Sequence, residues 1–254
     1  MAYAFTPTHE STERTGAGHG GKPPLSRRPT GGGGGGGDDG SNGPQHGPRE
    51  ALHRVRVFLF SALAADEVFF LVVVLLFYAR QSSTHMDPRT LRQIADWRPI
   101  PLPAILLLNT VALALSSGTA EAARRHIFKE IDVMDEWLGL GRPALRRSQM
   151  WLAGTLALGA LFLAGQWQAW RQLYAQGYTF SGAATPASYF FCLLTGLHAL
   201  HVLAGLLAIL FCLIVLRYIP RVESRQIAID ATVWFWHVMG LTWLALCGVL
   251  LFGQ

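Results

Sequence analysis

The sequence is poor in charged residues and in cysteine. Of its 254 residues only 15% are charged, whereas 51% are hydrophobic and the mean hydropathy is +0.29. Soluble domains carry about a quarter charged residues, so this composition argues against a soluble protein. The formal net charge of +5 does not predict nucleic-acid binding, because the positive residues stand in short segments around long apolar runs, as in membrane proteins.

Several chemical signatures are also missing. The three cysteines, Cys192, Cys212 and Cys247, lie inside apolar stretches, and their spacing matches neither a CxxC metal site nor a disulfide framework. We interpret them as small apolar packing residues. The sequence also has no nucleotide-binding loop, no catalytic triad and no CxxCH haem-attachment motif.

The first 50 residues lack an apolar run that could form the core of a signal peptide. They hold 14 of the 27 glycines and 6 of the 13 prolines. Because such a segment cannot bury enough surface to offset its chain entropy, we expect residues 1–50 to be a disordered tail and residues 51–254 to be the folded domain. The tail could be a tether to a partner or a tolerated extension.

The remainder consists mainly of long apolar stretches. A helix needs about 20 mostly apolar residues to cross a membrane, and five stretches reach this length. The predicted fold class is therefore all-α, a polytopic membrane bundle of five transmembrane helices. The five predicted spans are residues 57–79, 101–120, 148–170, 188–216 and 229–252.

The distribution of positive charge predicts the orientation of these spans. The tail and the loops that follow the second and fourth spans hold 16 of the 21 Lys and Arg residues, and the opposite side holds 5. Positive residues favour the cytoplasmic side. We therefore expect a cytoplasmic N-terminus and an external C-terminus.

Three acids lie in the spans: Asp66 and Glu67 in the first, and Asp230 at the start of the last. Glu67 falls near mid-bilayer, where an ionised carboxylate is costly and needs a proton, a hydrogen bond or a wet surface. It is a candidate functional carboxylate, with a structural hydrogen bond as the alternative. Asp66 points about 100° away around the helix, so the two acids need not share an environment.

Small residues on one face of a helix indicate close helix contacts. The third span has such a face at Ala153, Ala157, Ala160 and Ala164. The second span has another at Asn109, Ala112, Ser116 and Ala120. There, Asn109 could form a hydrogen bond to a neighbouring helix.

Histidines in the last two spans leave two interpretations open. His198, His201 and Gly205 share one face of the fourth span, and Asp230 and His237 share one face of the fifth. His198 or His201 could bind haem together with His237, as in a small membrane cytochrome, whereas a copper or iron site would need three or more ligands. Hydrogen bonds to a neighbouring helix, a lipid headgroup or a carboxylate are the alternative. A transporter built around Glu67 is a further class, but we detect no inverted repeat.

Five segments that occur in order carry a family resemblance. They are ADEVFF at 65–70, LNTVALALSSGT at 108–119, GALFLAGQ at 159–166, TGLHALHV at 195–202 and WFWHVMGLTWL at 234–244. Together they resemble the helices of haem-copper oxidase subunit III, in its short five-helix form.

The resemblance implies a non-catalytic structural subunit of a terminal oxidase (a cytochrome c oxidase) in aerobic respiratory electron transport. Haem and copper would lie in subunits I and II, and the chain itself would bind none. The helices would form two groups separated by a cleft that holds phospholipid. The chain would stabilise subunit I and support proton uptake, in a bacterial-type plasma membrane and within a larger respiratory supercomplex.

The resemblance also implies roles for particular residues. Glu67 matches the buried carboxylate of the family. The candidates for lipid or subunit contact are Asn109, His198, His201, Gly205, Asp230, Trp236 and His237. Two departures matter: Gly240 stands where an aspartate is common, and Ala169 stands where an acid is expected. The sequence leaves a quinol oxidase or a nitric oxide reductase open as the partner.

Overall fold

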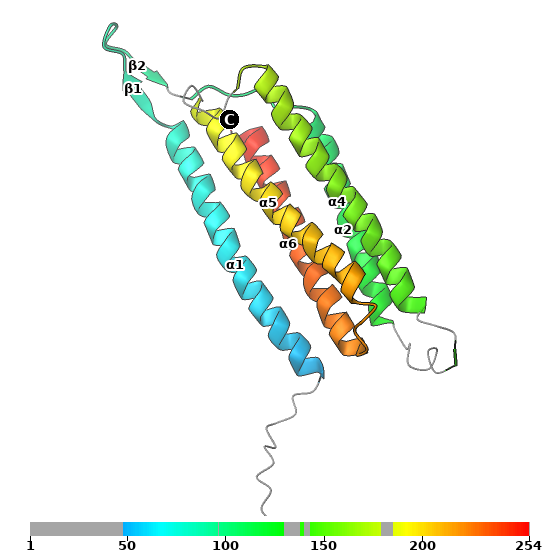
Figure 1. Ribbon diagram of the computed structural model, residues 1–254. Coiled ribbons are helices and arrows are strands. Elements are labelled where there is room, and N and C mark those ends of the chain that lie inside the picture. The colour runs from blue at the N-terminus through cyan, green and yellow to red at the C-terminus, as the bar shows by residue number, and fades with distance from the viewer. Residues whose placement is uncertain (1–47, 96, 130–137, 140–142, 179–184, 254) are drawn as a thin grey trace, which may run out of the picture. The chain divides into compact units, whose positions relative to one another are not determined.

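The computed structural model describes residues 48–95, 97–129, 138–139, 143–178 and 185–253. The tail predicted to be disordered lies almost wholly outside these residues. The helices and strands, labelled as in Figure 1, are α1 (Pro48–Gln81), β1 (Thr84–Met86), β2 (Gln93–Ala95), α2 (Ile105–Phe128), α4 (Pro143–Ala175), α5 (Pro186–Val215) and α6 (Val222–Phe252). All five helices are long and apolar enough to cross a membrane, which confirms the predicted fold class.

Each helix corresponds to one predicted span, but the ends differ. The second span was predicted from residue 101, whereas α2 begins at Ile105, because the prolines at positions 101 and 103 cannot donate the backbone hydrogen bonds of a helix interior. It then continues to Phe128, so Glu121 and Arg124 belong to the helix and not to the following loop. Ion pairs between residues three and four positions apart support these last turns.

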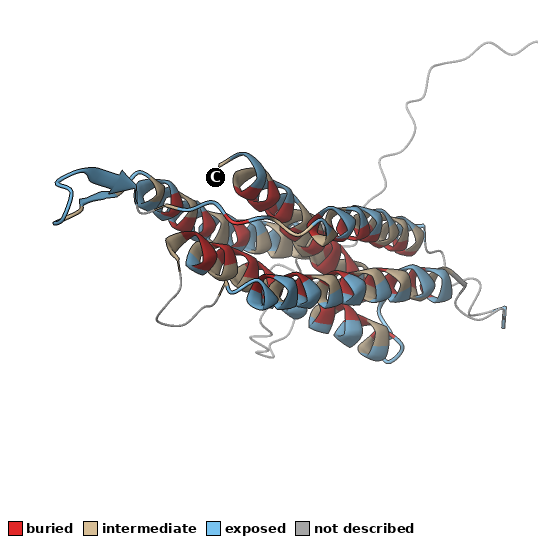
Figure 2. Cartoon of the chain, turned by 90° about the horizontal axis from the view of Figure 1, so that it is seen from above, coloured by how far each residue is buried: buried red, intermediate tan, exposed pale blue. Residues whose placement is uncertain are grey.

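Four of the helices contact one another in a closed ring, and the fifth packs on its outside. The contacts run from α2 to α4, from α4 to α5, from α5 to α6 and from α6 back to α2. Helix α1 contacts only α5 and α6 to any extent. Figure 1 shows α1 beside this pair, and Figure 2 shows the buried residues as stripes along the helices. The most apolar part of α1 is only 17% buried, against 39% in α5 and α6.

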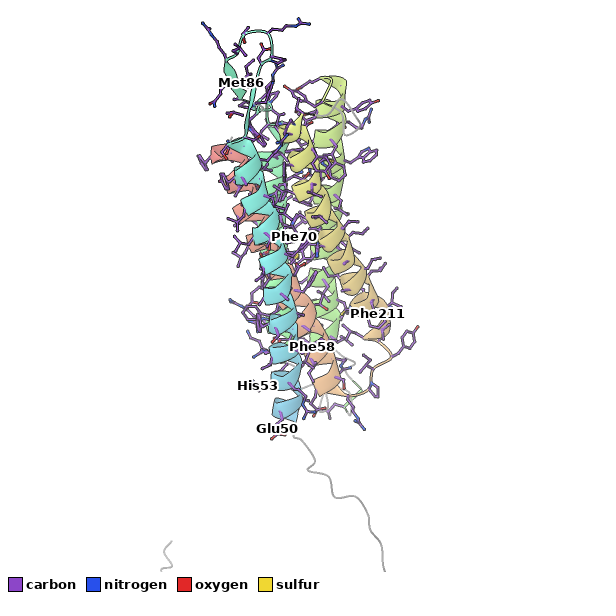
Figure 3. All side chains as sticks on the ribbon, turned by 90° about the vertical axis from the view of Figure 1, so that its left-hand side faces the viewer. Glu50, His53, Phe58, Phe70, Met86 and Phe211 are labelled. Atoms are coloured by element: carbon purple, nitrogen blue, oxygen red, sulfur yellow. The ribbon has the colours of Figure 1, made fainter. Side chains whose placement is uncertain are left out.

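Large side chains fill the ring, and a smaller cluster attaches α1. Phe162, Trp236 and Trp243 are almost fully enclosed in the main core. Phe70 and Phe77 of α1 form a second cluster with residues of α5 and α6, and Figure 3 shows Phe70 about halfway along α1. This cluster is small, so α1 depends more than the other helices on its polar contacts.

Of the two predicted small-residue faces, one makes helix contacts within the described chain and one does not. The face of α2 that contains Asn109, Ala112, Ser116 and Ala120 is buried against its neighbours. The alanine face of α4 is exposed, because the face that packs inward is the opposite one, which carries Phe162 and other large side chains. In α4 the close helix contact is made at Gly159 instead, where a Cβ atom would lie 2.6 Å from the Trp236 ring.

The cysteines are free thiols, as the sequence predicts. Cys212 and Cys247 are buried, and Cys192 is half-buried. Cys212 Sγ lies 3.4 Å from the hydroxyl of Thr232 on α6, so it contributes to the contact between α5 and α6.

A short β-hairpin between α1 and α2 was not predicted. Strands β1 and β2 pair antiparallel, with His85 opposite Ile94. The Asp87 carboxylate accepts hydrogen bonds from the Arg89 backbone and the Thr90 hydroxyl, which closes the turn. Figure 3 shows Met86 on this hairpin, beyond the end of α1. Three-residue strands with exposed side chains have too little hydrophobic periodicity to be recognised from sequence.

Candidate functional site

Two adjacent carboxylates near the middle of α1 face different helices. Asp66 contacts α5, whereas Glu67 contacts α6. Successive residues of a helix point about 100° apart, and the two helices that flank α1 lie in these two directions. The two acids therefore occupy separate environments, as helix geometry allows.

Asp66 is paired with His201. The carboxylate Oδ1 lies 3.0 Å from His201 Nε2, and the other ring nitrogen, Nδ1, lies 2.8 Å from the Leu197 carbonyl oxygen. Because a carbonyl oxygen can only accept, Nδ1 carries a proton and donates it. The pair lies beside the ring of Phe70, whose centroid is 5.3 Å from that of the imidazole.

Glu67 forms a hydrogen bond with the Thr242 hydroxyl on α6. The same hydroxyl lies 2.9 Å from the Val238 carbonyl oxygen, one turn earlier in α6. A hydroxyl has a single proton to donate, so the two acceptors compete for it. A proton on the Glu67 carboxyl would satisfy both contacts. The structural hydrogen bond that the sequence left open as the alternative for Glu67 is present, and it joins α1 to α6.

His198 lies inside the ring without a hydrogen bond from either ring nitrogen to any described residue. Its imidazole lies 5.2 Å from the Trp243 ring and 5.8 Å from the Phe162 ring, measured between centroids. Gln166, one turn after Phe162 on α4, is 1% exposed, and its amide also has no partner among the described residues. This part of the core therefore contains two polar side chains, His198 and Gln166, among the aromatic rings of Phe162 and Trp243.

Asp230 is the centre of an ion-pair network at one end of the bundle. Arg56 of α1 donates to both carboxylate oxygens, at 2.7 and 2.8 Å. Arg124 of α2 lies 3.4 Å from the same carboxylate and also pairs with Glu121 at 2.7 Å. His237 Nε2 lies 3.6 Å from Glu121. Asp230 itself is completely buried, so these contacts offset the cost of burying its charge.

Gly205 and Trp236 fix the approach of α5 to α6. A Cβ atom at Gly205 would lie 3.0 Å from the rings of Phe235 and Trp236, so only glycine fits without a shift. The Trp236 indole N–H donates to Ser116 Oγ at 2.9 Å, which also joins α6 to α2. These two residues of the sequence motifs therefore hold three helices together.

Asn109 lies apart from these groups, where α2 contacts α4. It is 3% exposed, and its amide nitrogen forms no hydrogen bond with any described residue, so the interhelical bond for which the sequence makes it available is absent at that atom. A Cβ atom at Gly165 would lie 1.9 Å from Asn109 Oδ1, so that glycine makes room for the amide.

The histidines do not converge on a common point. His201 faces a carboxylate on α1, His237 faces a carboxylate on α2, and His198 is enclosed by aromatic rings. This arrangement differs from the convergent pair that a haem iron needs. In the described ranges there is also no group of three or more His, Cys, Asp or Glu side chains that could hold a metal ion. The polar groups join neighbouring helices through hydrogen bonds and ion pairs.

Sequence reasoning missed Thr242, Arg56 and Glu121. Thr242 stands in one of the segments that carry the resemblance, but its role depends on Glu67 of α1, 175 positions earlier. Arg56 comes just before the first predicted span. Positive residues are common at the ends of membrane spans, so its pairing with Asp230 could not be recognised. Glu121 was assigned to a loop, and recognising that α2 continues past residue 120 would have placed it one turn from Arg124 and Arg125.

Comparison with known proteins gives a consistent result. Residues 53–253 match the family Cytochrome c oxidase subunit III. A probable cytochrome c oxidase subunit 3 of Nocardia farcinica is 28% identical over 162 residues, which cover 62% of this chain and 71% of that protein. The cytochrome c oxidase subunit 3 of Corynebacterium diphtheriae is 33% identical over 96 residues, 38% of this chain and 46% of that protein. The cytochrome c oxidase subunit 3 of Branchiostoma lanceolatum is 30% identical over 148 residues, which cover 58% of this chain and 50% of that protein. The chain, a multi-pass membrane protein by its five apolar helices, belongs to the cytochrome c oxidase subunit III family.

Proposed function

We propose that this chain is the non-catalytic, structural subunit of a haem-copper terminal oxidase and that it binds the oxidase subunits I and II. The family match across all five helices is the observation that carries the proposal. Subunit III of this family does not carry the redox cofactors. The polar side chains agree with that role, because His201, His237 and the three span acids are engaged with other helices of the chain.

The proposed contribution of Asp66 and Glu67 is to hold protons beside the oxidase core. Both carboxyls lie near the middle of α1, and each forms a contact that a shared or added proton completes. The Asp66 side chain is 24% exposed and that of His201 28%, so this pair is accessible from the surface of the bundle.

A bound phospholipid fits the hollow between the end of α1 and the start of α5. The hollow measures about 600 Å³, and its walls include Leu76, Ala79, Tyr189 and Phe190. These side chains suit an acyl chain. Arg80, at the end of α1, lies in the same wall and supplies a cation of the kind that phosphate groups bind.

The proposed setting is a bacterial plasma membrane, with the N-terminus in the cytoplasm and residues 1–50 as a tail outside the membrane domain. The positive charge on the loops supports this orientation. The network around Asp230 would then lie toward the cytoplasm, and the β-hairpin would lie outside the cell. A larger respiratory supercomplex is part of the same proposal.

Affinity purification of the tagged chain in a mild detergent tests the function. We expect haem-copper catalytic subunits to copurify and to supply all haem and copper absorbance. Mass spectrometry of the assembly then identifies the partner as a cytochrome c oxidase, a quinol oxidase or a nitric oxide reductase. A stable chain isolated without any catalytic subunit, or haem bound by the isolated chain and lost on substitution of His201 and His237, would contradict the proposal.

A further inference from the structure

A hollow lies between the end of α4 and the start of α5, and it shares no lining residue with the hollow beside α1. Its volume is about 610 Å³. Trp167 and Tyr174 in its wall are 62% and 66% exposed. The Trp170 indole N–H donates to Thr195 Oγ1 at 3.1 Å and so closes the hollow toward α5. The residues that line it are Trp167, Trp170, Arg171, Tyr174, Ala175 and Cys192. The hollow therefore opens outward, with aromatic rings and one cation on its walls.

The position of the hollow along α4 places it at the level of lipid headgroups. Because α4 ends at Ala175, Arg171 lies about 6 Å from the end of the helix and Trp167 about 12 Å from it, at 1.5 Å per residue. Trp and Tyr side chains are enriched at this level of membrane spans, where one end of the ring is apolar and the other is wet. The Arg171 guanidinium can thus meet headgroups, while Trp167 meets the first part of the acyl chains.

Arg171 has no acidic neighbour on the helices around it. No Asp or Glu occurs in residues 137–222, so α4 and α5 carry none. Helix α2 also contacts α4, and its one acid, Glu121, lies near the opposite end of α4, where Ser148 donates to the Ala123 carbonyl oxygen. The distance along α4 from Ser148 to Arg171 is about 35 Å. An anion that balances Arg171 must therefore come from outside these three helices.

An anionic phospholipid meets both the charge and the shape of the hollow. Its phosphate can accept two parallel hydrogen bonds from a guanidinium. An acyl chain can follow the wall past Cys192 to Gly196, one turn later in α5, where a Cβ atom would meet nothing within 4 Å. A zwitterionic lipid would bring a cation for which α4 and α5 offer no acid. Inorganic phosphate would use the guanidinium and leave the aromatic wall uncovered.

We propose that the α4–α5 hollow is a binding site for an anionic phospholipid, whose phosphate binds Arg171 and whose acyl chain lies along Trp170 and Cys192. The inference goes beyond the proposed function, because it requires only that the chain spans a membrane. A chain that purifies with an unexpected partner would contradict the proposed function and would leave this site to be tested in the same way.

The thiol of Cys192 reports on the occupant directly. It is half-buried in the wall of the hollow, whereas Cys212 and Cys247 are buried. In the purified, delipidated assembly that contains this chain, we expect phosphatidylglycerol in mixed micelles to slow the alkylation of Cys192 by N-ethylmaleimide at least severalfold. Phosphatidylcholine should slow it less, and inorganic phosphate should not slow it. Equal protection by the two lipids, protection by phosphate alone, or a thiol that is unreactive before lipid is added would each overturn the proposal.

Arg171→Gln tests the role of the cation. The change removes the charge from an exposed side chain, so the fold should be unaffected. Arg217→Gln is the matched control, because it removes an exposed arginine just after the far end of α5 and outside the hollow. We expect Arg171→Gln to raise the phosphatidylglycerol concentration needed to protect Cys192 by roughly tenfold, the loss expected for one charge-assisted hydrogen-bonding group. Arg217→Gln should leave it unchanged. Equal effects of the two changes, or no effect of either, would overturn the role of Arg171.

Gly196→Trp tests the path of the acyl chain. Gly248→Trp on α6 is its control, since a Cβ atom at either glycine meets nothing within 4 Å. With a phosphatidylglycerol that carries a photoreactive group on its acyl chain, we expect adducts on residues 167–174 in the parent chain. These adducts should fall severalfold in Gly196→Trp and persist in Gly248→Trp. Adducts that are confined to the hollow beside α1, or that are equal in the two variants, would overturn the proposed path.

Discussion

Asp230 has a fully buried carboxylate whose charge is met mainly by Arg56, 174 positions earlier in the sequence. The guanidinium and carboxylate form two short parallel hydrogen bonds, a geometry that gives strength as well as orientation. Arg124 adds a weaker contact from α2. One side chain thus connects α1, α2 and α6 at a single point, and a substitution there affects the placement of whole helices.

Arg56→Gln should destabilise the folded chain by about 3 kcal/mol, because it leaves the buried Asp230 carboxylate with only the longer contact to Arg124. We place the cost at the low end for buried pairs because the Arg56 side chain is 36% exposed. Asp230→Asn combined with Arg56→Gln should cost less than the sum of the single changes, since neither charge is then left alone. Thermal unfolding of the four variants in detergent measures this coupling, and strictly additive costs would rule it out.

Glu67→Gln should leave the oxidase assembled but change its proton-linked turnover or the rate at which turnover decays. Glutamine keeps a hydrogen bond to Thr242 and loses the ability to bind and release a proton. Thr242→Val is the matched control, because it removes the helix contact and keeps the carboxyl. Sustained oxygen consumption by the assembled enzyme is the measurement. Unchanged decay in Glu67→Gln would remove any functional role for this carboxyl beyond the contact itself.

Among the elements, α1 differs from the others in how it is held. The ring helices share a continuous core, whereas α1 is attached by a small aromatic cluster and by polar contacts at three levels. Arg56 binds Asp230 at one end, the two carboxyls bind α5 and α6 in the middle, and Gln81 donates to the Gly253 carbonyl oxygen at the other end. The few polar residues of α1 therefore fix its position against α5 and α6.

The ring helices depend on glycine at their closest approach. Gly159→Ala should destabilise the fold by roughly 1–3 kcal/mol, because its Cβ would lie 2.6 Å from Leu206 and from the enclosed Trp236 ring. Gly118→Ala is the control, since a Cβ there meets nothing within 4 Å. It should be neutral or stabilising by up to about 1 kcal/mol through helix propensity. Thermal unfolding compares the pair, and equal effects would contradict the close contact.

The hairpin should respond to acid in a defined range. The Arg89 backbone N–H and the Thr90 hydroxyl donate to the Asp87 carboxylate and lower its pKa below the ordinary 3.8. A lowered pKa in the folded state means that this stabilisation is present above about pH 3.8 and is lost as the pH falls through the lower value. The protection of the Arg89 backbone amide, meaning its exchange rate relative to the intrinsic rate at the same pH, should therefore fall once the pH drops below the lowered pKa of Asp87. Asp87→Asn should show no such change, and the same acid response in both chains would contradict the assignment.

The sequence predicts the elements better than their contacts. All five spans were found because a run of about 20 apolar residues is long enough to cross a membrane, and helix geometry allows Asp66 and Glu67 to face different neighbours. The exposed alanine face of α4 could not be predicted, because small residues mark a helix contact without saying whether the neighbour belongs to the same chain. The partners of Glu67 and Asp230 lie more than 100 positions away, and no local pattern indicates them.

For the whole molecule, the orientation in the membrane follows from charge and can be tested at two exposed positions on opposite sides. Met86, on the hairpin, is 60% exposed, and Ser224 lies in the first turn of α6 at the other end of the bundle. In a variant whose three native cysteines are replaced by alanine, Met86→Cys should react in intact cells with a maleimide that cannot cross membranes. Ser224→Cys should react only after permeabilisation, because the loop before α6 belongs to the side with 16 of the 21 positive residues. The reverse pattern would invert the orientation. It would then place the Asp230 network outside the cell and the hairpin within it, while the contacts that hold the five helices together would stay the same.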